Sequence, residues 1–191
     1  MNELNLPTSE QVEQELKREE YRRRYKRTLK STVFALVTAA ALAVLVATLW
    51  LPVLQIFGNS MNPTFQEGQI VVSVKDDAPE HGDIIAFYHG NKVLVKRCIA
   101  GPGAWVDITE TGTVLVNGVA LEEPYLSEEN MGICDIELPY QVPEGTYFLM
   151  GDARETSVDS RHSSIGCIKT EDMIGKIVYR VWPLSEFGSV S

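Results

Sequence analysis

Residues that build metal and redox sites are scarce in this sequence. Among its 191 residues there are three cysteines and three histidines. The spacing of the cysteines matches no zinc or redox motif, and their odd number leaves at least one thiol unpaired within the chain: Cys98, Cys134 and Cys167. The histidines are scattered and are expected at the surface: His81, His89 and His162. No metal and no cofactor is therefore predicted.

Basic residues are also few beyond the first thirty positions. The chain contains 17 Lys and Arg residues against 26 Asp and Glu residues, a net charge of −9. Residues 31–191 contain nine basic and twenty acidic side chains. Nucleic-acid binding requires clustered Lys and Arg, so this composition argues against it. The hydrophobic share of 45% is that of a globular chain, and the acidic part is long enough to bury a core without disulfides.

Charge is absent altogether between Lys30 and Glu67. Residues 31–50 read STVFALVTAAALAVLVATLW, and a helix of about 20 such residues crosses a bilayer. Trp50 has the position of an interfacial anchor, and Pro52 discourages further helix. The alternatives are a buried core helix, which would have a polar face, and a cleaved signal peptide, which would have a clearer cleavage site. We predict an uncleaved transmembrane anchor over residues 31–51, with the lipid bilayer as a partner.

The segment that precedes this run is basic. Residues 1–30 contain eight Lys and Arg residues and six acidic residues. The positive-inside rule places this segment in the cytoplasm and residues 55–191 in an extracytoplasmic domain of a single-pass protein of the cell membrane. Residues 8–30 are predicted to be helical and to do no more than hold this topology. A capping box of Thr8 with Gln11 favours the helix, as do three pairs at four-residue spacing: Glu13–Lys17, Glu19–Arg23 and Glu20–Arg24.

Beyond residue 55 the hydrophobic pattern changes to one that is typical of β-strands. Strands are predicted at 69–74, 83–88, 92–99, 113–116, 119–121, 147–150 and 174–181. Asn117 and Gly118, between two of them, are the strongest two-residue hairpin signal. The predicted fold is mainly β, with a single N-terminal transmembrane helix followed by an all-β, sandwich- or barrel-like domain.

Four short motifs lie among these strands. They are GNSMNPT at 58–64, GDII at 82–85, VKR at 95–97 and GDARETSVDSR at 151–161. Together and in this order, the motifs resemble those of the type I signal peptidases, the membrane-bound serine proteases that remove signal peptides. The resemblance extends over residues 31–182 and includes the anchor.

The chemistry of the motif residues agrees with this resemblance. A serine hydroxyl is a poor nucleophile until a base takes its proton, and no motif contains a histidine. A lysine serves as the base when it is neutral, and burial among apolar groups favours the neutral amine. Lys96 directly follows Val93, Leu94 and Val95, which could supply that environment. The ordinary alternative is a turn serine and an exposed strand lysine.

The resemblance implies a role for each motif. Ser60 would be the nucleophile, Lys96 the general base, and Ser157 the group that hydrogen-bonds the lysine amine. Asp159 and Arg161 would form a structural ion pair. The oxyanion hole of the family uses the backbone N–H of the nucleophile, which here is Ser60.

Two positions depart from the family pattern. Some members have a serine two residues before the nucleophile, and its hydroxyl is the second oxyanion donor. This chain has Gly58 there, as other members do, so its second donor must be backbone or water. Ala153 stands where the family usually has Asn.

Substrates of the family carry small side chains at positions −1 and −3 from the cut, as in A-x-A sites. The residues that align with the pocket walls are apolar and would exclude large or charged groups: Ile56, Met61, Phe65, Leu94 and Val95. The substrate, the signal peptide of a secreted pre-protein, is expected to add to a sheet edge as an extended chain. The enzyme is expected to act as a monomer without a cofactor.

Two other functions compete with this one. A membrane-tethered chaperone or assembly factor could keep the fold without catalysis, but such a protein would be expected to have lost Ser60 or Lys96. A self-cleaving repressor with a Ser-Lys pair is the second alternative. The acidic domain and the membrane span argue against it.

The motifs also yield a prediction for two cysteines. Cys98 directly follows the VKR motif, and Cys167 follows the GDARETSVDSR motif. Both motifs must meet at one site. We therefore predict that these two cysteines lie on neighbouring strands. Cys98 itself is expected to be a small buried hydrophobe.

Overall fold

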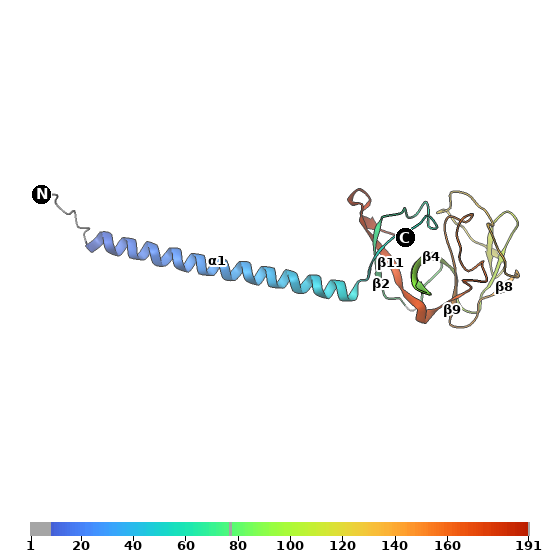
Figure 1. Ribbon diagram of the computed structural model, residues 1–191, viewed down its shortest axis with the longest axis horizontal. Coiled ribbons are helices and arrows are strands. Elements are labelled where there is room, and N and C mark those ends of the chain that lie inside the picture. Colours follow the sequence, from blue (N-terminus) through green and yellow to red (C-terminus); the bar gives the residue numbers. More distant parts are fainter. Residues whose placement is uncertain (1–8, 77, 191) are drawn as a thin grey trace. The chain divides into compact units, whose positions relative to one another are not determined.

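The computed structural model describes residues 9–76 and 78–190 and divides into two compact units, Met1–Leu49 and Trp50–Ser191. Figure 1 shows the described part of the first unit as one continuous helix and the second unit as a β-rich body. The division lies at the end of the apolar run. The second unit, Trp50–Ser191, is called the β domain below and has its own packed interior.

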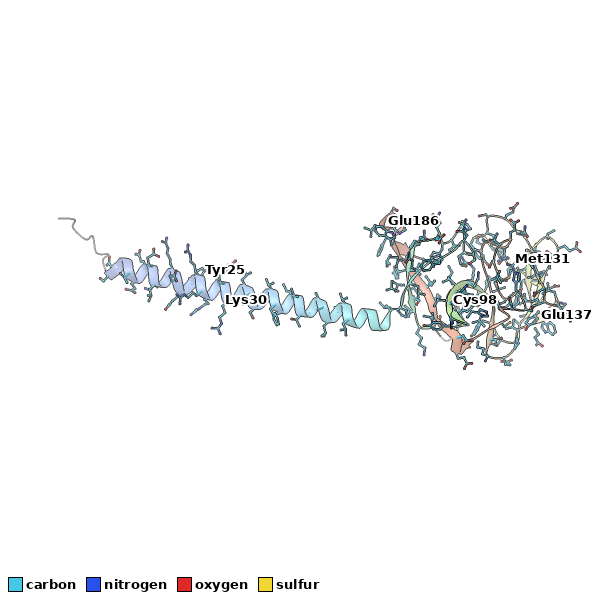
Figure 2. The ribbon with its side chains drawn as sticks, viewed as in Figure 1. Tyr25, Lys30, Cys98, Met131, Glu137 and Glu186 are labelled. Carbon is cyan, nitrogen blue, oxygen red and sulfur yellow. The ribbon has the colours of Figure 1, made fainter. Side chains whose placement is uncertain are left out.

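The helix α1 extends over Ser9–Trp50 and includes both the charged segment and the apolar run. Within its stretch Val12–Leu45, a window of 18 residues has a mean hydropathy of 1.8 and is not buried, so the helix is long and apolar enough to cross a membrane. The predicted pairs Glu13–Lys17 and Glu19–Arg23 form salt bridges of 2.7 and 3.5 Å. Tyr25 and Lys30 lie on the polar part of this helix (Figure 2).

Two predictions for the ends of the helix fall outside the described residues. The capping box needs Thr8 and the side chain of Gln11, and the interfacial anchor needs the side chain of Trp50. Both remain predictions.

Most strands of the β domain belong to one antiparallel sheet of eight strands. The order along it is β1-β2-β11-β3-β4-β9-β10, and β12 pairs with β11. No pairing among the described strands joins β1 to β10, so this sheet is open and does not form a closed barrel. The bounds are β1 Val53–Gln55, β2 Ile70–Val74, β3 Ile84–His89, β4 Lys92–Ala100, β9 Thr146–Met150, β10 Ile168–Lys169, β11 Met173–Trp182 and β12 Gly188–Ser189, with short 3-10 helices at Thr170–Asp172 and Leu184–Glu186.

A second sheet has four strands in the order β7-β6-β5-β8. Its strands are β5 Trp105–Ile108, β6 Val114–Val116, β7 Val119–Ala120 and β8 Tyr140–Gln141. The predicted hairpin joins β6 to β7, and its turn residues Asn117 and Gly118 have φ values of 52° and 79°, as a type I′ turn requires. Val106 of this sheet packs with Phe148 and Met150 of β9 in one core cluster.

The segment that carries the serine motif is held by another core cluster. Ile56, Met61 and Phe65 pack there against Val71 of β2 and Ile177 of β11. Burying one such side chain contributes about 1.5–3 kcal/mol. These apolar residues therefore fix the turn between β1 and β2 that contains Ser60.

The two cysteines lie on either side of β9 and not on directly adjacent strands. Cys98 on β4 faces Leu149 of β9, whereas Cys167 directly precedes β10 on the other side of β9. All three cysteines are free. Cys98 is buried inside the β domain (Figure 2), and this burial raises the pKa of its thiol to about 12. It is the small buried hydrophobe that we predicted.

Candidate active site

Strand β4 carries two buried cations on opposite faces. Lys96 and Arg97 are consecutive residues of this strand, paired with Ile85 and Ile84 of β3, so their side chains point to opposite sides of the sheet. Both are only 2% exposed. A buried charge is costly unless it is paired. Lys96 and Arg97 avoid this cost in different ways.

The Lys96 amine contacts a hydroxyl group. Its Nζ donates a hydrogen bond of 2.8 Å to Ser157 Oγ. Burial lowers the pKa of Lys96 from 10.5 to about 8, against the negative charge of Asp159, which raises it. The expected burial of this lysine is therefore present, and near pH 8 a large fraction of the amine is neutral.

Ser157 connects this amine to a buried carboxylate. Burial alone would raise the pKa of Asp159, but the hydrogen bonds and charge of Arg161, the Gly151 N–H and the Ser157 side chain lower it. Asp159 is therefore an anion, and Arg161 Nε and Nη2 donate to it at 2.9 and 2.8 Å, which is the expected ion pair. A serine hydroxyl has one hydrogen, so giving it to Asp159 leaves the oxygen lone pairs for Lys96.

Ser60 and Ser157 approach each other across Gly151. A Cβ atom added to Gly151 would lie 2.1 Å from Ser157 Oγ and 2.5 Å from the Ser60 carbonyl oxygen. Real Cβ atoms do not approach other atoms so closely, so only glycine fits here. The absence of a side chain at Gly151 allows the serine motif to lie beside the hydroxyl that contacts Lys96.

The turn at 151–154 is fastened to the serine motif at two further points. The Ala153 N–H donates to the Ser60 carbonyl oxygen at 3.1 Å, and the Thr64 hydroxyl donates to Asp152 at 2.5 Å. The bond from Ala153 uses only the backbone. The turn therefore forms without the Asn that the family usually has at this position.

Arg97 completes this connection from the other face of β4. Its Nε and Nη2 donate to the two carboxylate oxygens of Asp152 at 2.9 and 2.7 Å, and its Nη1 donates to the Gly82 carbonyl oxygen at 2.8 Å. Strand β4, which carries Lys96, is thereby linked to the turn at 151–154, and that turn is bonded to Ser60. Arg97 has no predicted role, and its only signal in the sequence is its position in the VKR motif at 95–97.

A second buried ion pair was missed entirely. Arg154 and Glu123 form a salt bridge in which both side chains are almost fully buried. Arg154 Nε also donates to the Gly151 carbonyl oxygen at 3.1 Å, and the Tyr125 hydroxyl donates to Glu123 at 2.6 Å. The guanidinium of Arg97 lies 3.8 Å from the centre of the Tyr125 ring. No spacing in the sequence points from Glu123 to the 151–161 motif.

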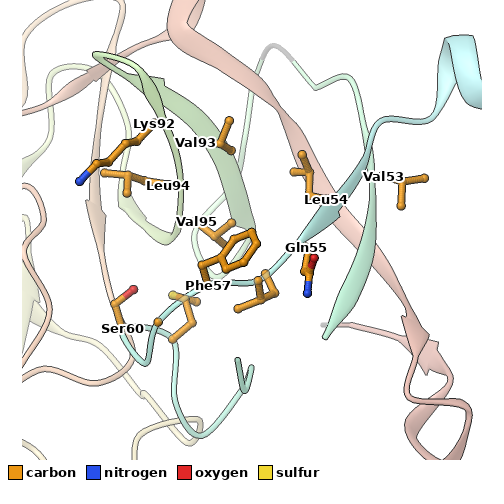
Figure 3. Close-up of a pocket in the computed structure, with 12 residues that line it drawn as sticks. Val53, Leu54, Gln55, Phe57, Ser60, Lys92, Val93, Leu94 and Val95 are labelled. Atoms are coloured by element: carbon orange, nitrogen blue, oxygen red, sulfur yellow. The ribbon is translucent and has the colours of Figure 1, made fainter. Parts of the chain in front are cut away.

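A groove of about 580 Å³ opens beside Ser60 (Figure 3). Four of the five predicted wall residues line it together with Phe57: Ile56, Met61, Leu94 and Val95. Phe65 lies elsewhere, since it is fully buried in the core with Ile56 and Met61. The walls of the groove are mainly apolar.

Gly58 also lines this groove. Its φ is +76°, a backbone conformation that favours glycine, although an added Cβ would meet nothing within 4 Å. Space is therefore available for a side chain, but the backbone disfavours one.

One edge of β4 beside the groove carries no neighbouring strand. Lys92 to Lys96 pair with β3, whereas the pairing with β9 begins only at Arg97. No other described strand covers the open side. The backbone groups of this edge can pair with an added extended chain.

Metal-binding side chains do not gather in the described part of the chain. No group of three or more His, Cys, Asp or Glu residues there could hold a metal ion. His81 and His89 are exposed, and His162 is half-buried. The polar groups that surround Ser60 and Lys96 are hydroxyls, carboxylates and guanidinium groups.

Comparison with known proteins identifies the class of this molecule. Residues 29–182 match the family model described as signal peptidase, peptidase S26. The protein is therefore a peptidase with an N-terminal helix of membrane-spanning length. More particularly, the chain belongs to the signal peptidase family, peptidase S26, which confirms the resemblance found in its motifs.

Two sequence relatives agree with this assignment. Signal peptidase IB of Staphylococcus aureus (strain COL) is 36% identical over 153 residues, which cover 69% of this chain and 78% of the relative. Signal peptidase I of Streptococcus pneumoniae serotype 4 is 29% identical over 175 residues, which cover 71% and 84% of the two chains. A crystal structure of a signal peptidase I from Enterococcus faecalis V583 is 33% identical, with 52% of this chain and 96% of that chain covered and a TM-score of 0.45.

Proposed function

We propose that this protein removes the signal peptides of secreted pre-proteins by cutting after small residues, with Ser60 as nucleophile and Lys96 as general base. The observation that carries the proposal is the buried Lys96 amine, whose pKa is lowered to about 8 and which is bonded to Ser157. The proximity of Ser157 to the Ser60 backbone across Gly151 supports the pairing of this amine with Ser60.

The first half of the reaction would form an acyl-enzyme. Ser60 Oγ attacks the carbonyl carbon of the −1 residue, and its proton passes to the neutral amine of Lys96. Because Ser157 accepts one N–H of that amine, the lone pair of the nitrogen can be directed toward Ser60. The resulting ammonium gives its proton to the leaving amine nitrogen, and the peptide bond breaks.

The second half would release the signal peptide. Lys96, neutral again, takes a proton from water, and the hydroxide attacks the ester carbon. The ammonium returns this proton to Ser60 Oγ as the ester bond breaks, which restores both groups.

The oxyanion of each tetrahedral intermediate would accept a hydrogen bond from the Ser60 backbone N–H. Gly58 offers no hydroxyl as a second donor, so backbone or water must supply it. One such donor contributes about 2.7–4 kcal/mol to transition-state stabilisation.

The groove supports the choice of small side chains at the cut. An extended substrate that pairs with residues 92–96 of β4 would point alternate side chains to the same side. Residues −1 and −3 would then both face the apolar walls formed by Ile56, Met61, Leu94 and Val95. A charged side chain there would lose its hydration without gaining a partner.

The same proposal predicts the location and the membrane topology of the protein. α1 would cross the cell membrane once with its N-terminus in the cytoplasm, because the eight basic residues precede the apolar run. The β domain would then be extracytoplasmic. Ser60 follows Trp50 by ten residues in the sequence, so the site would lie on the side of the membrane at which signal peptides emerge, and one copy of the chain would be sufficient for the chemistry.

A cleavage assay tests this function. Full-length protein in detergent micelles is incubated with a pre-protein that carries an A-x-A site, and the products are mapped by mass spectrometry. We expect one cut directly after the site. Ser60→Ala, Lys96→Met and Lys96→Arg should each be folded and inactive, since a guanidinium stays protonated, with a loss of at least ~10²–10⁴ in rate without the base. Ser157→Ala should lose less than any of these, because it removes only the orienting group.

Exposed positions supply the matched controls. Ser127→Ala and Lys169→Arg change the same residue types away from the groove and should retain the wild-type rate. Cleavage by Lys96→Met at a tenth of the wild-type rate would show that another group is the base. A folded wild-type protein that cuts no pre-protein would instead favour the non-catalytic chaperone.

A further inference from the structure

Lys92 differs from the other cations of the β domain. Of the nine basic residues in 31–191, four are buried: Lys96, Arg97, Arg154 and Arg161. Three others form ion pairs with carboxylates, at Lys169, Lys176 and Arg180, and Lys75 has an interaction of its own. Lys92 is exposed and has no ion-pair partner among the residues that the structure describes.

This free cation lies at the candidate substrate groove. Lys92 lines the groove with Leu94, and Figure 3 shows the two side chains on the same side of β4. It is the one charged side chain among the described residues that line the groove. A ligand in the groove would therefore meet apolar walls near Ser60 and a positive charge at Lys92.

The strand geometry gives the spacing between this charge and the reaction. Lys92 and Lys96 are four residues apart on β4, on the same face, and therefore roughly 13 Å apart at about 3.3 Å per residue. An extended substrate paired along this edge advances by the same distance per residue. For a substrate that runs parallel to β4 with its −1 residue opposite Lys96, the residue opposite Lys92 is the one near −5.

We propose that Lys92 is a specificity-determining residue that favours signal peptides with an acidic side chain near −5 and disfavours those with a basic one. This inference rests on the proposed function. The β domain is strongly acidic overall, so most of its surface repels an acidic substrate side chain. Lys92 would attract such a side chain within the groove. Exposed ion pairs contribute little each, so the expected preference for Asp over Lys is about two- to fivefold in kcat/KM.

The test uses three peptides that share one A-x-A site and differ only at −5, where they carry Asp, Ser or Lys. Full-length wild-type protein and Lys92→Glu are compared in uncharged detergent micelles. We expect the Asp-to-Lys ratio of kcat/KM to exceed one for the wild type and to fall below one for Lys92→Glu. Raising NaCl from 20 to 500 mM should bring both ratios toward one, because salt screens exposed charges.

Lys169→Glu is the matched control, since it makes the same charge change on β10 outside the groove. It should leave the Asp-to-Lys ratio at the wild-type value. An identical Asp-to-Lys ratio in wild type and Lys92→Glu would overturn the role of Lys92. An equal shift of the ratio in Lys169→Glu would also overturn it, because the preference would then come from the net charge of the domain. Cleavage of the Ser peptide separates these failures from a failure of the proposed function, in which the wild type would cut none of the three.

Discussion

At the residue scale, the pKa of Lys96 sets the expected pH dependence of the reaction. Burial lowers this pKa from 10.5 to about 8, and the amine accepts a proton only when neutral. The competent fraction therefore rises as the pH rises through this value. We expect kcat/KM to increase about tenfold per pH unit well below pH 8 and to level above it.

The measurement is the initial rate between pH 6 and pH 10, with a peptide that has no titrating group in that range. Full-length protein in an uncharged detergent keeps the surroundings of Lys96 intact. A limb centred near 10.4 would mean that the lysine is solvated, and a limb near 6.5 would point to a histidine.

Single residues differ in how far the sequence predicts them. The burial of Lys96 was predictable, because its apolar neighbours in the strand are visible in the sequence. The partner of Arg97 was not, because Asp152 is 55 residues away and only the pairing of β4 with β9 brings the two together. Phe65 was expected at the groove but lies in the core, since a short apolar segment does not reveal which of its residues face inward.

At the scale of elements, the turn at 151–154 is the part on which the site depends most. Gly151→Ala would place a methyl group against Ser157 Oγ, Ser157 Cβ and the Ser60 carbonyl oxygen. We expect a destabilisation of about 1–3 kcal/mol from overpacking and a loss of about 10²-fold in kcat, since displacements near 1 Å have effects of that size. Thermal unfolding and peptide cleavage measure the two effects.

Gly188→Ala is the control for this substitution. Gly188 on β12 has no atom within 4 Å of an added Cβ and no left-handed φ, so alanine should be tolerated there. Wild-type kcat in Gly151→Ala would show that Ser60 and Ser157 can separate without consequence, which contradicts their proposed cooperation with Lys96.

The longer strands and one hairpin were predictable from the sequence, whereas most of the short strands were not. The long strands β4 and β11 and the hairpin β6–β7 were found, because alternation over several residues or an Asn-Gly turn marks them. The strands β1, β8, β10 and β12 have two or three residues each, too few for a periodic pattern. The predicted β-rich domain is present as two sheets that are not closed, and the order of the strands in them depends on pairing that no single strand encodes.

At the scale of the whole molecule, the chain combines a long helix with an apolar run and a β domain with a packed interior. The 42 residues of α1 correspond to roughly 63 Å at 1.5 Å per residue, about twice the thickness of a hydrocarbon core. If the apolar run spans the bilayer, the charged part of the helix before residue 31 would therefore extend beyond it on one side. The β domain carries its own hydrophobic clusters.

The charge asymmetry between these parts leads to the last prediction. Eight basic residues precede the apolar run, and the next cation after it is Lys75. This distribution favours a cytoplasmic N-terminus, since basic flanks resist translocation. In cells that express the full chain with an epitope tag before residue 1, protease added from outside should digest the β domain and spare the tag. After the cells are opened, the same protease should remove the tag, which excludes intrinsic resistance. A β domain that is protected in intact cells and digested only after lysis would reverse the orientation, and the site could then not meet signal peptides on the outer surface.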